Sequence, residues 1–191
     1  IRAAGAREAA IRHAIALAQA ARASVTAAGI ACPCVTGGGT GSFVHEAASH
    51  AEGVYDEIQP GSYVFMDRDY ATNETTPHAP VFEHALFVKS QVISRGVAHA
   101  VVDAGHKAHA IDSGLPSVHG QPFDYGNGGD EHGLITTHAA PLPALGDTVW
   151  LVPGHCDPTV NLHEHLVVLR GGLDRGVVDA VWPVDARGRL D

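Results

Sequence analysis

The sequence has little of what marks a secreted, membrane-bound or nucleic-acid-binding protein. Its 191 residues include three cysteines and only two lysines, Lys89 and Lys107. Two of the cysteines are separated by a single proline, so a disulfide framework is not expected, and a reducing, cytoplasmic compartment is predicted. No apolar run approaches the ~18–20 residues that span a bilayer, and no charged-then-apolar signal segment opens the chain, so no membrane partner is expected.

Basic charge is also scarce. The net charge is −9, because 21 acidic side chains outnumber 12 lysines and arginines. A chain without a basic face has no means of releasing counterions from a phosphate backbone, so nucleic acid is not an expected partner. An initiator methionine is missing as well. Ile1 opens in mid-pattern without an N-cap residue, and this predicts that upstream sequence is absent.

The first 60 residues have the pattern of an α/β unit with a parallel sheet. Alanine and apolar spacing favour a first helix, which Gly29 would end. The expected order is helix, strand, glycine-rich turn, helix and strand, at Ile1–Ala28, Ile30–Thr36, 37–42, Phe43–Ala51 and Val54–Gln59.

After about residue 62 helical periodicity almost vanishes, and short strand-like runs alternate with turns. The predicted strands are His84–Arg95, Ala98–Asp112, Gly133–His138, Asp147–Val152, Glu164–Arg170 and Gly176–Val184. Turn residues separate them, as at Asp124–Asp130 and 170–172. This spacing predicts an antiparallel β-domain, either a barrel or a sandwich.

The glycine-rich segment GGGTGS at 37–42 follows a predicted strand and precedes a helix. Glycines allow the backbone to approach phosphate oxygens closely, and the hydroxyls of Thr40 and Ser42 can add hydrogen bonds. No lysine follows, so the nucleotide P-loop pattern fails, and the dinucleotide fingerprint is not matched well. The segment indicates either a site for one phosphate group or a plain tight turn.

Potential metal ligands are concentrated at 153–163, directly after a predicted strand. His155 and Asp157 are two residues apart, which on extended backbone places both on one side, while Cys156 should point away. One imidazole and one carboxylate form a partial coordination sphere suited to Mn²⁺ or Zn²⁺, and the carboxylate favours the harder ion. A polar turn between strands is the alternative, and spacing assigns no role to His163 or His165.

Five motifs, in order along the chain, resemble the D-threonine aldolase family: VTGGGTGS, EIQPGSYVFMD, VVDAGHKAHAIDSGLP, DEHG and PGHCDPTVNLHEHLVV. The wider family includes D-serine and 3-hydroxyaspartate dehydratases and is similar to alanine racemase in fold. The resemblance covers essentially the whole chain. It implies the last units of a (β/α)₈ barrel that binds pyridoxal phosphate at 1–66, followed by an antiparallel β-domain with a metal site at 67–191.

The resemblance also implies residue roles. The implied cofactor contacts are Thr36, Gly38, Gly39, Thr40 and Tyr63. The implied ligands of a divalent metal, Mn²⁺ before Zn²⁺, are His155 and Asp157. The family's Schiff-base lysine and catalytic histidine belong to earlier parts of the barrel, so no catalytic residue is expected in this fragment, which should be inactive alone.

The implied activity is retro-aldol cleavage of D-threonine and related D-3-hydroxy amino acids to glycine and an aldehyde, by a homodimer. The pair His155 and Asp157 favours the aldolase, because the dehydratases tend to carry His-x-Cys. Cys156, one place earlier, leaves open a D-serine or 3-hydroxyaspartate dehydratase that gives a keto acid and ammonia. Two other readings are a cofactor-free, metal-dependent hydrolase and a non-catalytic dimerisation or capping module.

Overall fold

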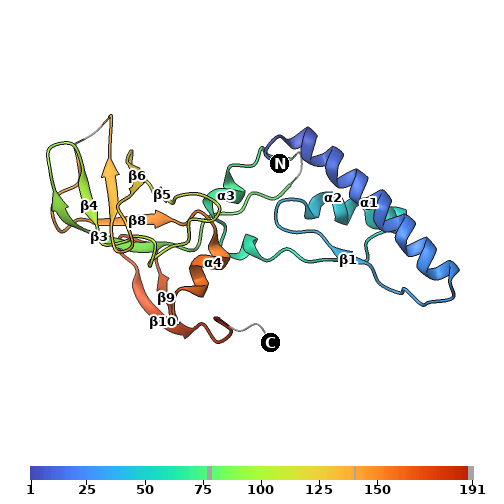
Figure 1. Ribbon diagram of the computed structural model, residues 1–191. Coiled ribbons are helices and arrows are strands. Elements are labelled where there is room, and N and C mark those ends of the chain that lie inside the picture. The colour runs from blue at the N-terminus through green and yellow to red at the C-terminus, as the bar shows by residue number, and fades with distance from the viewer. Residues whose placement is uncertain (77–78, 140, 189–191) are drawn as a thin grey trace. The chain divides into compact units, whose positions relative to one another are not determined.

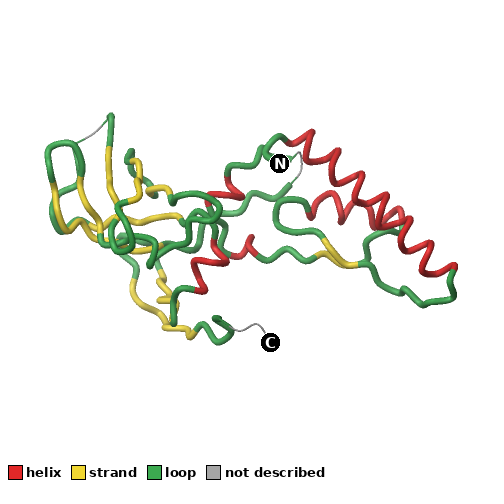
Figure 2. Tube along the Cα trace, viewed as in Figure 1, coloured by secondary structure: helices red, strands yellow, loops and turns green. Residues whose placement is uncertain are grey.

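The chain folds into two compact units, Ile1–Ala85 and Leu86–Asp191 (Figures 1 and 2). The computed structural model describes residues 1–76, 79–139 and 141–188. Among these residues, no helix combines the length and the hydropathy needed to cross a membrane. The sequence-based division after residue 66, between barrel units and β-domain, stays a prediction.

The helices and strands of the first unit are short apart from the first helix. They are α1 (Ala4–Ala27), β1 (Thr36–Gly37), α2 (Phe43–Ala48), β2 (Glu57–Ile58) and α3 (Arg68–Ala71), with 3₁₀ turns at Ser49–Glu52 and Ser62–Val64. The predicted first helix is confirmed, and Gly29 ends it with a φ of +79° that favours glycine. Arg7 of α1 is buried and donates to the carbonyl oxygens of Ile1, Arg2 and Glu74.

The parallel pairing of β1 with β2 is much shorter than expected. Thr36 lies opposite Glu57, and Gly37 lies opposite Ile58. The prediction of a strand over Ile30–Thr36 was wrong for residues 30–35, which form no strand. Pro33 has no N–H to give to a ladder, so regular pairing starts only after it.

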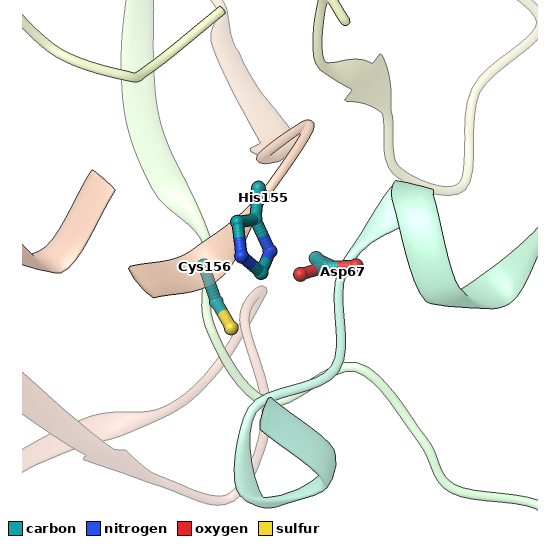
Figure 3. Close-up of side chains that lie close together, drawn as sticks. All are labelled: Asp67, His155 and Cys156. Atoms are coloured by element: carbon teal, nitrogen blue, oxygen red, sulfur yellow. The ribbon is translucent and has the colours of Figure 1, made fainter. Parts of the chain in front are cut away.

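Helix α3 was not predicted, and its first turn is closed by a side chain. Asp67 (labelled in Figure 3) is the N-cap residue, and its Oδ1 accepts a hydrogen bond from the Tyr70 N–H at 2.8 Å. The preceding residue, Met66, has a φ of +50°, in the left-handed region. The chain therefore turns sharply into α3.

The second unit contains a six-stranded sheet in the order β5-β8-β3-β4-β7-β6, and every pair is antiparallel (Figure 1). The strands are β3 (Val88–Arg95), β4 (Ala100–Val102), β5 (Ser117–Val118), β6 (Asp124–Asn127), β7 (Gly133–Thr136) and β8 (Thr148–Val152). The two end strands, β5 and β6, contact each other, so the sheet nearly closes on itself. The prediction of an antiparallel β-domain is confirmed.

The core of this unit lies inside the nearly closed sheet. Its buried apolar side chains are Val92, Ala100, Val102, Ala104, Tyr125, Ile135, Val149 and Leu151. Along β7 and β8 burial largely alternates with the two-residue period of a strand. Both strands had been predicted from the sequence, over Gly133–His138 and Asp147–Val152.

A helix and a two-stranded ribbon complete the second unit. Helix α4 spans Cys156–Asn161, and the antiparallel strands β9 and β10 span His165–Arg170 and Val177–Pro183. Arg170 donates to both carboxylate oxygens of Asp179 across the ribbon, at 3.1 and 2.9 Å. The predicted strands over 164–170 and 176–184 are confirmed with slightly shorter bounds.

Two predictions for this unit were wrong. Asp124–Asp130 was expected to be a turn, but residues 124–127 form β6, where Tyr125 is buried. Ala98–Asp112 was expected to be one strand, but only Ala100–Val102 is. The chain leaves the sheet because Gly105 packs against the backbone at 129–132, so closely that a Cβ there would lie 2.6 Å from the Asp130 carbonyl carbon.

A buried histidine–tyrosine pair ties this irregular segment to β6. His109 is fully buried, and its Nε2 lies 2.8 Å from the Tyr125 hydroxyl, which donates to the Ala104 carbonyl oxygen at 2.7 Å. Since the tyrosine hydrogen is used there, His109 Nε2 must donate to Tyr125. Burial raises the pKa of Tyr125 to about 12, which keeps that hydroxyl protonated.

We expect His109 to make the second unit less stable in acid. Desolvation by burial, with a smaller contribution from His106, lowers the pKa of His109 below its usual value of 6.5. The folded protein therefore favours the neutral imidazole, whose contribution is complete above pH 6.5 and is lost as the pH falls through the folded-state pKa. Urea unfolding followed between pH 7.5 and 5.5 should show this decline. In His109→Gln the free energy of unfolding should depend less on pH. An unchanged pH dependence would show that His109 is not its cause.

Candidate functional site

The glycine-rich loop at 37–42 joins β1 to α2 and folds back on itself. The N–H groups of Ser42 and Phe43 both donate to the Gly39 carbonyl oxygen, at 3.0 and 2.9 Å. The Thr40 hydroxyl accepts a hydrogen bond from the Tyr63 N–H at 3.0 Å. The structure thus brings together Thr40 and Tyr63, which the resemblance implied as cofactor contacts.

One glycine sets the conformation of this loop, and a second leaves its backbone accessible to a ligand. Gly38 has a φ of +85°, and a Cβ there would lie 3.0 Å from the carboxyl carbon of Glu46. A Cβ built on Gly39 would meet nothing within 4 Å, so the backbone is open on that side. An anion could approach the loop at Gly39 without meeting a side chain.

The donor set of the loop fits one phosphate group. Within the described residues, the N–H groups of Thr40 and Gly41 donate to no backbone carbonyl, whereas the Gly39 N–H donates to the Ser42 hydroxyl at 3.3 Å. Thr36 is less available, because its hydroxyl already donates to the Glu57 carboxylate at 3.1 Å. The N–H groups of Thr40 and Gly41 are therefore better placed than the Thr36 hydroxyl to hold a phosphate, and Gly39 leaves room for it beside them.

His155 and Asp157 lie at the start of α4, directly after β8. His155 has extended backbone, with φ −140° and ψ 135°, and is the N-cap residue of α4, whereas Asp157 belongs to the first helical turn. The expectation of extended backbone was right for His155 and wrong for Asp157. Their side chains still meet, with Nε2 and Oδ2 3.6 Å apart.

The backbone before this pair has no room for a side chain. A Cβ at Gly154 would collide with the carbonyl group of Gly114, lying 2.9 Å from its carbon atom. The close approach holds the strand end against the 110–114 turn. His155 is consequently presented from a packed position rather than from a free loop.

Cys156, next to His155 in Figure 3, does not point away from the site as expected. Its side chain is buried, and its Sγ donates to the Asp157 Oδ1 at 3.1 Å. Helical backbone from residue 156 onward turns the thiol toward the first turn, which extended backbone would not have done. The thiol therefore orients the carboxylate of Asp157.

This arrangement fits a divalent metal ion. Two ligands of one ion, each at about 2.0–2.2 Å, lie roughly 3–4 Å apart, and the Nε2 to Oδ2 distance of 3.6 Å falls in this range. The Asp157 side chain is 67% exposed, so coordination positions for water or substrate could remain open. One imidazole and one carboxylate suit Mn²⁺ or Zn²⁺.

The other histidine singled out in this segment, His163, has a different role. Its Nε2 lies 2.8 Å from the Ala108 carbonyl oxygen, so it anchors the end of α4 to the 108–110 segment. His165 begins β9, opposite Pro183. Sequence spacing gave no signal for either position, because the partners are far away in the chain.

Lys107 does not have the surroundings of a reactive amine. Lys107 forms an exposed ion pair with Glu131, and this partner raises the pKa of Lys107 and lowers that of Glu131. Lys89 lies in β3 opposite Trp150. The ion pair with Glu131 keeps the Lys107 amine protonated at neutral pH, so this amine is unsuited to attack a carbonyl group.

Known proteins share this chain's sequence and fold. Residues 85–169 match the family described as "Putative serine dehydratase domain". The chain is 47% identical over 164 residues to a D-threonine aldolase of Arthrobacter sp, a match that covers 84% of this chain and 41% of that protein. Over most of its own length, this chain is similar to D-threonine aldolase.

Two further matches extend over nearly the whole chain. A 3-hydroxy-D-aspartate aldolase of Paracoccus denitrificans (strain Pd 1222) is 43% identical over 189 residues, covering 96% of this chain and 47% of that protein. The crystal structure of D-threonine aldolase from Filomicrobium marinum matches with a TM-score of 0.91 and 43% identity, over 98% of this chain and 50% of that one. The chain therefore spans about half the length of the relatives it matches.

Proposed function

We propose that the complete protein cleaves D-threonine and related D-3-hydroxy amino acids to glycine and an aldehyde, with pyridoxal phosphate and a divalent metal. The homologues named as aldolases of D-threonine and 3-hydroxy-D-aspartate support this substrate class. The observation in this chain that carries the proposal is the 3.6 Å separation of His155 Nε2 and Asp157 Oδ2.

We propose that Gly38, Gly39, Thr40 and Tyr63 lie at the cofactor phosphate, with Thr36 at its edge. Open backbone at Gly39 and the Thr40–Tyr63 hydrogen bond support this placement. Bound there, pyridoxal phosphate would supply an electron sink for the amino acid. The chain's own contribution is to fix the phosphate and so orient the cofactor ring. We place the Schiff-base lysine and the catalytic base outside these 191 residues, so the fragment alone should not turn over substrate.

We propose that His155 and Asp157 hold the metal, Mn²⁺ before Zn²⁺. A divalent ion held by these residues would supply Lewis acidity, which lowers the pKa of a bound hydroxyl. His155 gives the site a rigid ligand from the strand end, and Asp157 gives it charge. The Cys156 thiol limits rotation of the carboxylate through its hydrogen bond to Oδ1.

The remaining parts of the proposal concern the complete protein. We expect residues 1–66 to be the last units of a (β/α)₈ barrel and the whole enzyme to be a cytoplasmic homodimer. The parallel pairing of β1 with β2 next to two helices is consistent with barrel units.

A dehydratase is the second candidate, favoured by one observation. Cys156 lies within hydrogen-bond distance of Asp157, so a thiol is available beside the proposed ligands. In a dehydratase the hydroxyl leaves, and the products are a keto acid and ammonia. Product identity separates the two reactions.

The deciding experiment is product analysis of the complete protein with D-threonine and D-serine, in the presence of pyridoxal phosphate and Mn²⁺. Glycine and acetaldehyde from D-threonine are the expected products. A keto acid and ammonia would move the function to the dehydratases. Turnover without any absorption band of bound cofactor would favour the cofactor-free hydrolase. No turnover at all would favour the non-catalytic dimerisation or capping module.

A further inference from the structure

The hydroxyl of Thr159, in the middle of α4, uses both of its hydrogen-bonding roles. Thr159 is 1% exposed. Its Oγ1 donates to the His155 carbonyl oxygen at 2.7 Å and accepts from the Ala110 N–H at 3.2 Å. A bond from threonine to the carbonyl four residues back is common in helices, but the second bond, to a residue outside the helix, is not part of that pattern. Thr159 therefore links the backbone of His155 to a distant segment.

The same segment holds the far end of α4. His163 Nε2 lies 2.8 Å from the Ala108 carbonyl oxygen, so it must carry a hydrogen and donate. Both the neutral tautomer with Nε2–H and the imidazolium can do so, and the link is therefore kept in either charge state. Residues 108–110 thus hold the helix at two points.

Segment 108–110 is itself fixed by the core of the second unit. His109, between the two anchor points, is fully buried and hydrogen bonded to the Tyr125 hydroxyl, which donates to Ala104. A chain of hydrogen bonds therefore runs from β6 through 108–110 and Thr159 to the carbonyl of His155. The position of His155 is set by the packed core rather than by the short helix alone.

We propose that Thr159 is a positioning residue for the metal ligand His155; this inference rests on the proposed role of His155 and Asp157 as metal ligands. Thr159 does not touch the ion. It fixes the carbonyl of His155, and with it the direction in which the imidazole leaves the backbone. Groups that orient a ligand in this way commonly change metal affinity by about 10–100-fold when they are removed.

The test measures Mn²⁺ affinity of the 191-residue chain by titration, alongside thermal unfolding of the metal-free protein. Thr159→Val keeps the size of the side chain but removes both hydrogen bonds, and we expect Mn²⁺ binding to weaken by about 10–100-fold. Thr159→Ser restores the hydroxyl and should bind within about threefold of the unmodified chain, on the same reasoning.

Ser90→Ala is the matched control. Ser90 in β3 is also buried, at 2% exposed; its hydroxyl donates to Asp103 at 2.8 Å and, among the described residues, makes no hydrogen bond to α4. We expect it to lose stability without losing Mn²⁺ affinity. If Thr159→Val binds Mn²⁺ like the unmodified chain, if Thr159→Ser fails to restore binding, or if Ser90→Ala weakens binding equally, the inference is overturned.

A fourth variant distinguishes this failure from failure of the proposed function. If His155→Ala abolishes Mn²⁺ binding while Thr159→Val has no effect, only the positioning role is wrong. If His155→Ala binds Mn²⁺ as well as the unmodified chain, or if the unmodified chain binds none, the proposed metal site is wrong and the role of Thr159 falls with it.

Discussion

Replacing Gly133 with alanine is expected to lower the free energy of unfolding of the second unit by about 3 kcal/mol or more. A Cβ at this position would lie 2.6 Å from the Tyr125 Cζ and 2.7 Å from the Ala104 carbonyl oxygen. The ring has little freedom to move aside, because its hydroxyl is bonded to both His109 and Ala104. The added methyl group must therefore displace the backbone of β7 or break the buried hydrogen bonds.

Urea unfolding followed by tryptophan fluorescence measures this effect, since Trp150 and Trp182 both belong to the second unit. Gly126→Ala in the neighbouring strand β6 is the matched control. Its Cβ would meet the Leu134 Cβ at 3.6 Å, which is ordinary van der Waals contact, and we expect a change within about 0.5 kcal/mol. Equal destabilisation by the two substitutions would show that the collision with Tyr125 is not the cause.

Removal of either proposed metal ligand is expected to weaken Mn²⁺ binding by more than about 100-fold, which exceeds the usual effect of residues that only orient a ligand. His155→Ala removes the imidazole, and Asp157→Ala removes the only charged group of the pair. Neither substitution should unfold the chain, because the Asp157 side chain is 67% exposed and that of His155 is 23% exposed. Titration with Mn²⁺ gives the affinity, and circular dichroism of the metal-free variants checks the fold.

Cys156→Ala decides between the two readings of this segment. If Cys156 only orients Asp157 through its hydrogen bond, the variant should bind Mn²⁺ within about tenfold of the unmodified chain. If instead Cys156→Ala binds as poorly as Asp157→Ala, the thiol is itself a ligand. That result would favour the dehydratase reading.

Local pattern predicted the elements that depend on their own residues. The alanine-rich α1 follows from composition and apolar spacing, and β7 and β8 are short apolar runs between turns, so their bounds were nearly right. Strand β6 was missed because its sequence, DYGN, contains turn residues. Only the fold shows that burial of Tyr125 and pairing with β7 outweigh that local preference.

The candidate site, too, was predicted from the sequence only in part. The ligand types at His155 and Asp157 were predicted from the sequence, but the helix that begins at Cys156 was not. Pro158 lies in the first turn of this helix, where the missing N–H costs nothing. The bonds of Thr159 and His163 to residues 108–110 could not be predicted, because their partners lie about fifty positions earlier in the chain.

The order of strands in the second unit has a kinetic consequence. The central strand β3 pairs with β8, so that Val88 lies opposite Leu151, and most of the unit's sequence must be looped out before this pairing forms. Loop-closure entropy opposes such distant contacts early in folding. We therefore expect the segment after β8, which carries His155, Asp157 and the whole of α4, to reach its final surroundings only once the sheet has assembled. The proposed ligands would then come together late in folding. An ion that binds His155 and Asp157 would stabilise the folded unit rather than help to start its folding.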